Sequence, residues 1–243
     1  MKNSLALLNI RTFVVVAISL VASVLTLRYN LKINNAVILF GILVVFPLVK
    51  SFQFAFKRRE KSLEYLSLFK GGLIAVHQFF HHSKKLVPEH KAKAREVILR
   101  AIESLLTYLK TGQPDVKDVY ARLDQVSVFM KEHREELSGK NITLIIRQMR
   151  DVYVSTAFLV SMRRHRTVAA LRAFALVFIA VFPLVQAPIL NNTFEGNSIM
   201  VVSITCLTGF ILATLFNVQH QLENPFDQIG HDDIKLDDFR AEI

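Results

Sequence analysis

The chain has 243 residues, of which 52% are hydrophobic and 19 are Phe, and its formal net charge is +10. A mean hydropathy of +0.35 is too high for an ordinary soluble globule, so the composition predicts a membrane protein. The single cysteine, Cys206, excludes an internal disulfide framework.

Apolar residues are clustered in four uncharged segments: 12–27, 33–49, 173–194 and 197–222. A membrane-spanning helix needs about 20 mostly apolar residues. The last two segments reach this length, whereas the first two span only if flanking Lys and Arg side chains extend to the membrane surface. Two alternatives are that the first pair are buried helices, or that the first is a secretory signal, although it lacks a clear small-residue cleavage site. We predict four transmembrane helices.

Basic residues concentrate between the second and third segments, with 24 Lys and Arg against 12 acids over residues 50–172. Lys and Arg beside spans are retained in the cytoplasm, so this region and, with four spans, both termini are expected there. The predicted divisions are 1–57 (transmembrane helices 1 and 2), 58–166 (cytoplasmic helical region), 167–218 (transmembrane helices 3 and 4) and 219–243 (acidic tail). Nucleic acid is an alternative partner for this charge, but its place beside the spans favours anionic lipid.

The cytoplasmic region has a helical pattern throughout and no strand pattern, so the fold class is all-α. From Phe52 to about residue 86 only Gly71–Gly72 interrupts the pattern. Pro88 suits the first turn of a second helix, and Ser138–Gly139 suits the end of a third. Apolar stripes at helical spacing predict the buried faces of the second and third helices: Val97, Ala101, Leu105 and Leu109, then Val116, Val119, Leu123, Val126 and Met130. From Asn141 onward no residue breaks the helix before the third span, so one continuous helix into the membrane is expected.

Histidines are the main candidates for metal chemistry. His77 and His81 are four residues apart on one helical face, and His82 and His90 follow. Membrane desaturases and hydroxylases use paired histidines to hold iron, but they need several such clusters, and His133, His165, His220 and His231 are scattered singly. A solvated, pH-sensitive helix face is the favoured reading. No nucleophile motif or glycine-rich phosphate loop is present, so we predict neither an enzyme nor a bound metal.

The second apolar segment carries large side chains at helical spacing. Ile42 and Phe46 share one face, Phe52 lies on a neighbouring stripe, and Pro47 should kink the helix between them. Such stripes ordinarily pack against other helices. In an oligomer built around an axis, they could instead line a hydrophobic constriction. No predicted span contains an acid that could relay protons, which argues against a proton-coupled transporter.

The tail is acidic, with seven Asp and Glu against two bases over residues 219–243. It should dock on the basic region, with Phe226, Ile234 and Leu236 as apolar anchors, although a frayed, solvated tail is the alternative. This tail resembles the segment after the last span in the bestrophin family, where an acid or Asn precedes Pro-Phe: the chain reads QLENPFD at 221–227 and DIKLD at 233–237. The order of two spans, a helical block, two spans and a tail is similar to that family over nearly the whole chain.

The resemblance implies a pentameric ion channel in a bacterial inner membrane, passing chloride or monovalent cations. Ile42, Phe46 and Phe52 would form its neck. Animal members bind calcium in a clasp at this tail, and Gln221, Asn224 and Asp232 match the positions of its ligands. Ile229 stands where a further acid is expected, so a structural tail held by Pro225 and Phe226, without a cofactor, is favoured over a calcium site. The alternative function is a non-conducting membrane scaffold whose basic helices bind a protein or lipid.

Overall fold

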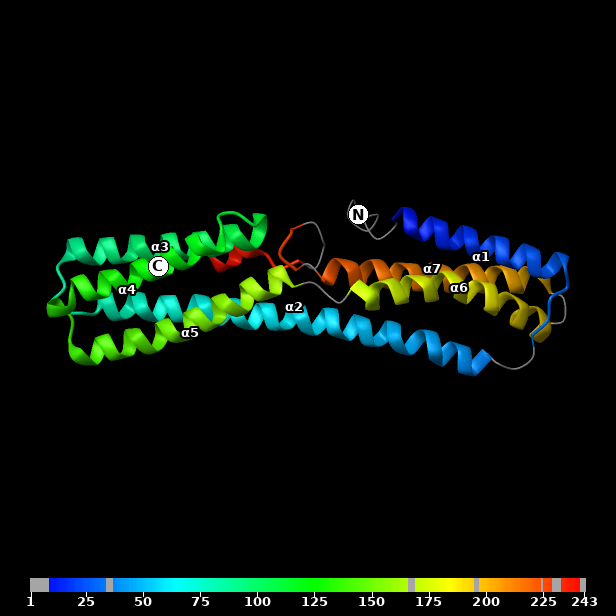
Figure 1. Ribbon diagram of the computed structural model, residues 1–243, viewed down its shortest axis with the longest axis horizontal. Coiled ribbons are helices and arrows are strands. Elements are labelled where there is room, and N and C mark those ends of the chain that lie inside the picture. Colours follow the sequence, from blue (N-terminus) through cyan, green and yellow to red (C-terminus); the bar gives the residue numbers. More distant parts are fainter. Residues whose placement is uncertain are drawn as a thin grey trace. The chain divides into compact units, whose positions relative to one another are not determined.

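The computed structural model describes residues 9–33, 37–165, 169–194, 197–223, 225–228 and 233–240, and within them it is all-helical (Figure 1). The α-helices are α1 (Ile10–Arg28), α2 (Val37–His81), α3 (Pro88–Thr111), α4 (Val116–Glu132), α5 (Gly139–Arg164), α6 (Ala169–Thr193) and α7 (Ser198–Leu222). Two short 3-10 helices are η2 (Arg134–Glu136) and η3 (Leu236–Phe239). The chain divides into two compact units, which we call the membrane unit (residues 1–57 and 167–223) and the core unit (residues 58–166 and 224–243).

The membrane unit contains three described segments that are long and apolar enough to span a membrane: Ile10–Arg28, Arg172–Thr193 and Ser198–Leu222. They correspond to the first, third and fourth expected spans. The second expected span falls at the start of α2, where the side chains of residues 37–45, 47 and 48 lie outside the described part of the chain. Four spans in total therefore stay a prediction.

Polar side chains join the helices inside the membrane unit. The Asn217 side chain in α7 donates to Thr12 Oγ1 in α1 at 2.9 Å, and both residues are buried. The Gln186 amide in α6 donates to Thr208 Oγ1 in α7 at 3.2 Å. The hydrocarbon of a membrane contains no water, so polar side chains there must find hydrogen-bond partners within the protein. Neighbouring helices supply these partners.

The core unit has a conventional hydrophobic interior. One face of α2 places Leu66, Phe69, Leu73, Val76 and Phe80 in it, each at most 1% exposed. The predicted stripes of the next two helices meet this face, since Ala101, Leu105 and Leu109 of α3 and Val119, Leu123 and Val126 of α4 are buried in the same cluster. Regular spacing of three or four residues along each helix produces these faces. Met130 is buried with them, whereas Val97 and Val116 are only partly buried against the cluster, so the two stripes are confirmed as core residues except at these two positions.

Helix ends in the core unit differ from two expectations. Ser138–Gly139 does not close a helix: Ser138 caps the start of α5, because its hydroxyl accepts the Asn141 backbone N–H at 3.2 Å. The expected continuous helix into the third span was also wrong, since α5 ends at Arg164 and α6 begins at Ala169. The Arg163 side chain donates to the carbonyl of Leu109 near the end of α3, so a contact with α3 holds the end of α5.

Gly71 and Gly72 do not interrupt α2, which is one helix from Val37 to His81 (Figure 1). A side chain at residue 72 would place its Cβ 2.7 Å from Val152 Cγ2 of α5, whereas a Cβ at residue 71 would meet nothing within 4 Å. Gly72 therefore allows close packing of α2 against α5. The pair reads as a helix breaker in sequence, but packing outweighs the modest helix penalty of glycine.

The acidic tail docks on the core unit, as expected. Phe226, Ile234 and Leu236 are at most 4% exposed and belong to its hydrophobic cluster. The Ile234 N–H donates to the Pro225 carbonyl at 2.9 Å, which closes the intervening loop. Polar contacts accompany these apolar ones: Arg240 of the tail pairs with Glu103 of α3 at 3.1 Å, and Lys70 of α2 donates to the Asp238 carbonyl at 2.9 Å.

Candidate functional site

The first candidate site is the face of α2 that points away from the other helices of the membrane unit. Ser51 and Ala55 are each 1% exposed, which identifies the packed side of α2 in this region. Phe46 is 61% exposed and Val49 is 44% exposed. At about 100° per residue, both lie on the side opposite Ser51 and Ala55. Among the described residues of the membrane unit, Phe46 and Val49 thus form an apolar face of α2 that the other helices do not cover.

The three predicted neck residues are not equivalent in the structure. Phe46 lies on the uncovered face, with the Lys50 ammonium 5.5 Å from the centre of its ring. Phe52 is half-buried and lies between the packed and uncovered faces. Ile42 is within α2, one turn before Phe46, but its side chain lies outside the described residues, as does that of Pro47, whose expected kink stays a prediction.

A polar network links α2, α6 and α7 on the packed side of α2, opposite this face. The Gln219 amide of α7 donates to Ser51 Oγ of α2 at 2.5 Å and to Glu223 Oε1 at 3.2 Å. Glu223 follows α7, is 4% exposed, and accepts from the Arg172 guanidinium of α6 at 2.5 Å. A buried carboxylate is tolerated when a paired cation and hydrogen bonds replace water. We call Ser51, Arg172, Gln219 and Glu223 the latch; sequence reasoning missed it, because residues 51, 172 and 223 are far apart in the chain.

The tail supplies the second predicted site, of which the structure describes a part. Pro225 and Phe226 are buried, so they anchor the tail, and Gln221 is half-buried in the last turn of α7. Asn224, Asp232 and Ile229 lie outside the described residues. The anchoring role of Pro225 and Phe226 follows from their burial, while calcium binding by the clasp stays a prediction.

The rings of His77 and His81 of α2 and of His82, directly after it, lie close together. The ring centres of His77 and His81 are 5.8 Å apart, and those of His81 and His82 are 5.5 Å apart. Burial lowers the pKa of His77, and electrostatic interactions with His81, Arg95 and His82 lower it further. Within the described residues no acid or cysteine joins this cluster to make a set of three metal ligands.

A different set of residues comes together with metal-ligand spacing. His90, His133 and Glu136 each offer one ligand atom, and these atoms lie within 4.8 Å of one another. Hydrogen bonds from His90 and then His133 hold the pKa of the Glu136 carboxyl below its usual range. Sequence reasoning grouped His90 with the α2 histidines and left His133 as an isolated residue. Only the meeting of α3 with the end of α4 reveals the cluster.

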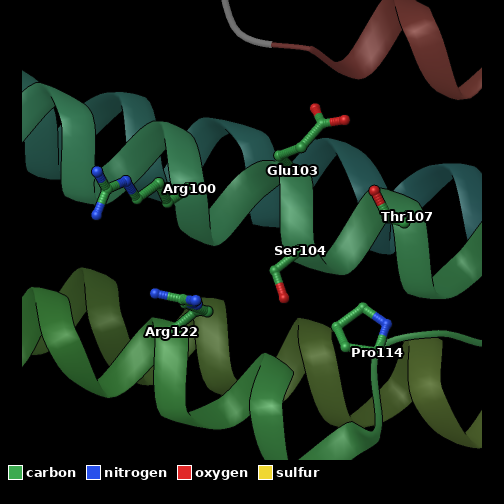
Figure 2. Close-up of a pocket in the computed structure, with 6 residues that line it drawn as sticks. All are labelled: Arg100, Glu103, Ser104, Thr107, Pro114 and Arg122. Atoms are coloured by element: carbon green, nitrogen blue, oxygen red, sulfur yellow. The ribbon is translucent and has the colours of Figure 1, made fainter.

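A pocket of about 330 Å³ lies between α3 and α4, lined by Arg100, Glu103, Ser104, Thr107, Pro114 and Arg122 (Figure 2). The buried Ser104 hydroxyl has no hydrogen-bond partner. Arg100 already pairs with Glu96 of its own helix, so its charge is partly satisfied. The pocket is a weaker candidate than either the α2 face or the His-Glu cluster.

Comparison with known proteins gives a clear result for the fold. No family model matches the sequence, and no curated protein matches it. A solved structure of a bacterial bestrophin homologue from Klebsiella pneumoniae, in a variant form, is 11% identical with a TM-score of 0.78, covering 95% of this chain and 93% of that chain. A second variant of that homologue is 13% identical with a TM-score of 0.76, covering 95% of both chains. A structure described as a membrane protein is 12% identical with a TM-score of 0.77, covering 95% of this chain and 93% of the other. The chain therefore has the fold of the bacterial bestrophin homologues, and the resemblance seen in its tail is confirmed at the level of the fold.

Proposed function

We propose that this chain is a bestrophin-like ion channel subunit. Identical subunits, five in number, would surround a central axis and pass small inorganic ions, chloride or monovalent cations, down their gradient. The exposed apolar face of α2 around Phe46 would line the narrowest part of the pore. The observation that carries the proposal is this face, present in a chain with the fold of the bestrophin homologues.

An axis-lining helix needs one face for its own subunit and another for the pore. Ser51 and Ala55 supply the first face, because they are buried within the membrane unit. Phe46 and Val49 supply the second, and their apolar side chains would form a constriction that water and ions cross only when it widens. Of the predicted neck residues, Phe46 is therefore the one most strongly supported, ahead of Ile42 and Phe52.

The latch gives this pore helix a fixed attachment. Ser51 lies five residues beyond Phe46 and is held by Gln219, which also binds the Arg172–Glu223 pair. A rotation of α2 that moves Phe46 would have to break or re-form these contacts. We assign the latch the role of holding α2 in one rotational position.

The membrane setting follows the charge pattern. The basic residues on either side of the central region would keep it and both termini in the cytoplasm of a bacterial inner membrane, with anionic lipid as a surface partner. Conduction of this kind needs no reaction cycle, so the proposed function is transport without enzymatic activity.

Purified protein in planar bilayers tests the proposal. We expect a five-subunit particle by native mass spectrometry and a current that Phe46→Ala raises several-fold, because the constriction becomes wider. Phe13→Ala is the matched control: Phe13 is 66% exposed on α1 and is not proposed to face the pore, so the current should be unchanged.

An unchanged current in a conducting Phe46→Ala protein would remove Phe46 from the pore. A monomer or dimer without current would instead support the alternative function, a non-conducting membrane scaffold that binds partners or lipid through its basic helices.

A further inference from the structure

Three potential metal ligands meet at one end of the core unit, where α2 ends, α3 begins and α4 gives way to α5 (Figure 1). His90 lies in the first turn of α3, His133 directly follows α4, and Glu136 is the last residue of η2. We propose that His90, His133 and Glu136 bind a divalent transition-metal ion such as Zn²⁺. This site is independent of the proposed pore, because it lies in the core unit and requires no oligomer.

The spacing of the ligand atoms suits such an ion. His90 Nδ1 is 3.0 Å from Glu136 Oε2, and His133 Nδ1 is 3.0 Å from Glu136 Oε1. Zinc bonds of about 2.0–2.1 Å place neighbouring ligand atoms of a tetrahedral ion about 3.3 Å apart. The two observed separations are slightly shorter than this value and involve different oxygens of Glu136, and one ligand atom from each residue lies within 4.8 Å of the others. Side-chain movements would therefore let the three groups share one ion in place of their hydrogen bonds.

The chemistry of the ligands selects the class of metal. Imidazole nitrogen binds Zn²⁺, Ni²⁺, Cu²⁺ and Fe²⁺ well, whereas Ca²⁺ and Mg²⁺ prefer shells made of oxygen. Two histidines and one carboxylate would leave at least one position of the ion for water. The side chains of His90 and Glu136 are 32% and 28% exposed, so an ion could reach them from solvent.

The surrounding structure holds the three ligands in place. The buried Ser83, just after α2, donates its hydroxyl to the Glu136 carbonyl at 2.9 Å. The His133 ring packs on Phe129, with ring centres 4.4 Å apart, and its side chain is only 13% exposed. The ion would therefore tie the start of α3 to the α4–α5 connection, and through Ser83 to the end of α2.

A metal-free alternative has the same geometry. A carboxylate that accepts hydrogen bonds from two imidazoles can join these segments by itself. The two readings differ in one respect: only the metal site makes stability depend on the concentration of a transition-metal ion.

The experiment uses the full-length protein in detergent, stripped of metal with a chelator and then titrated with ZnCl₂ or, separately, MgCl₂. We expect about one zinc ion per chain after desalting and a rise in Tm of several degrees with zinc but not with magnesium. His90→Ala and Glu136→Gln should each abolish both effects. His165→Ala, which removes an exposed histidine elsewhere, should leave them intact.

Three results would overturn the proposal. One is zinc that neither binds nor changes Tm in the unmodified chain, which would leave the hydrogen-bonded alternative. Another is binding that survives His90→Ala but is lost in His77→Ala/His81→Ala, which would place the ion on α2. The third is binding that no variant alters. If Glu136→Gln fails to fold without metal, the His90→Ala variant is compared with the unmodified chain instead, because His90 is the more exposed of the two residues.

Discussion

The two units of this chain distribute polar and apolar side chains in opposite ways. Of the fourteen buried polar residues among those described, ten lie in the membrane unit, including Asn191, Asn217 and Gln219. Of the thirty large apolar residues exposed in the described part of the chain, twenty-five also lie there. The core unit instead buries its apolar residues in one cluster.

This reversal reflects two different solvents. In water, burial of apolar surface stabilises a fold, and charged groups remain outside. In lipid, apolar groups lose nothing by facing outward, so helices associate through close packing and hydrogen bonds. The comparison predicts that equivalent substitutions in the two units will have unequal effects on stability.

The largest expected effect is at the apolar anchor of the tail. Phe226 is 1% exposed within the core unit, so Phe226→Ala should lower the free energy of unfolding by about 3–5 kcal/mol. Phe174→Ala, at a position 47% exposed on α6, should change it by no more than about 0.5 kcal/mol. Denaturant unfolding of both variants in the same detergent gives the comparison. Equal losses would contradict the assignment of different solvents to the two units.

A smaller and more local effect is expected at the adjacent glycines of α2. Gly72→Ala should destabilise the protein by about 1–3 kcal/mol, because its Cβ would lie 2.7 Å from Val152 Cγ2. Gly71→Ala is the matched control: its Cβ meets nothing within 4 Å, so relief of the helix penalty should stabilise the protein by about 0.5–1 kcal/mol. Thermal unfolding measures both shifts. A shift of the same sign in the two variants would show that α2 and α5 do not pack closely at residue 72.

Within the membrane unit, the hydrogen bond between Asn217 and Thr12 should contribute little on its own. A double-mutant cycle with Asn217→Leu and Thr12→Val should give a coupling free energy of about 0.6 kcal/mol. The modest value is expected because the separated helices find other partners for these groups. A coupling near zero would mean that packing, rather than this hydrogen bond, joins α1 and α7 here.

The smallest effect concerns the pH dependence of the core unit. The pKa of His77 is lowered in the folded state, so below about pH 6.5 the unfolded chain binds a proton more readily than the folded chain. The resulting contribution to stability is present above that pH and is lost as pH falls through the folded pKa. His77→Gln should therefore lose less stability than the unmodified chain on acidification, as measured by unfolding at a series of pH values. Identical pH profiles would remove His77 as a contributor.

Much of the fold could be predicted from sequence because it rests on periodicity. The spacing in the sequence predicts the stripes through Leu105 and Leu123 and the apolar anchors Phe226, Ile234 and Leu236. The structure buries all of these residues except Val97 and Val116, which are partly buried against the same cluster. Helix ends are harder to predict, because the same residue can suit the end of one helix, the start of the next or a close packing contact. Ser138 was read as part of a helix end and is instead an N-cap, and Gly72 was read as an interruption and is a packing contact.

The candidate sites divide in the same manner. The spacing of four residues between Ile42 and Phe46 is enough to place both on one helical face. The exposure of Phe46, and the partial burial of Phe52, could be known only after α2 had packed through Ser51 and Ala55. Arg172 and Glu223 are brought together from two helices, so no local pattern in the sequence could pair them.

The solvent of each segment can be predicted from local sequence alone: apolar length marks the spans, charge marks the region beside them, and helical spacing marks the buried faces. These properties are local, since each depends on residues within a few turns of one another. Contacts between distant polar groups, as in the latch and in the set His90, His133 and Glu136, emerge only when the helices pack. Such meetings depend on how helices pack, and helices of the same pattern can pack in many arrangements that bring different residues together.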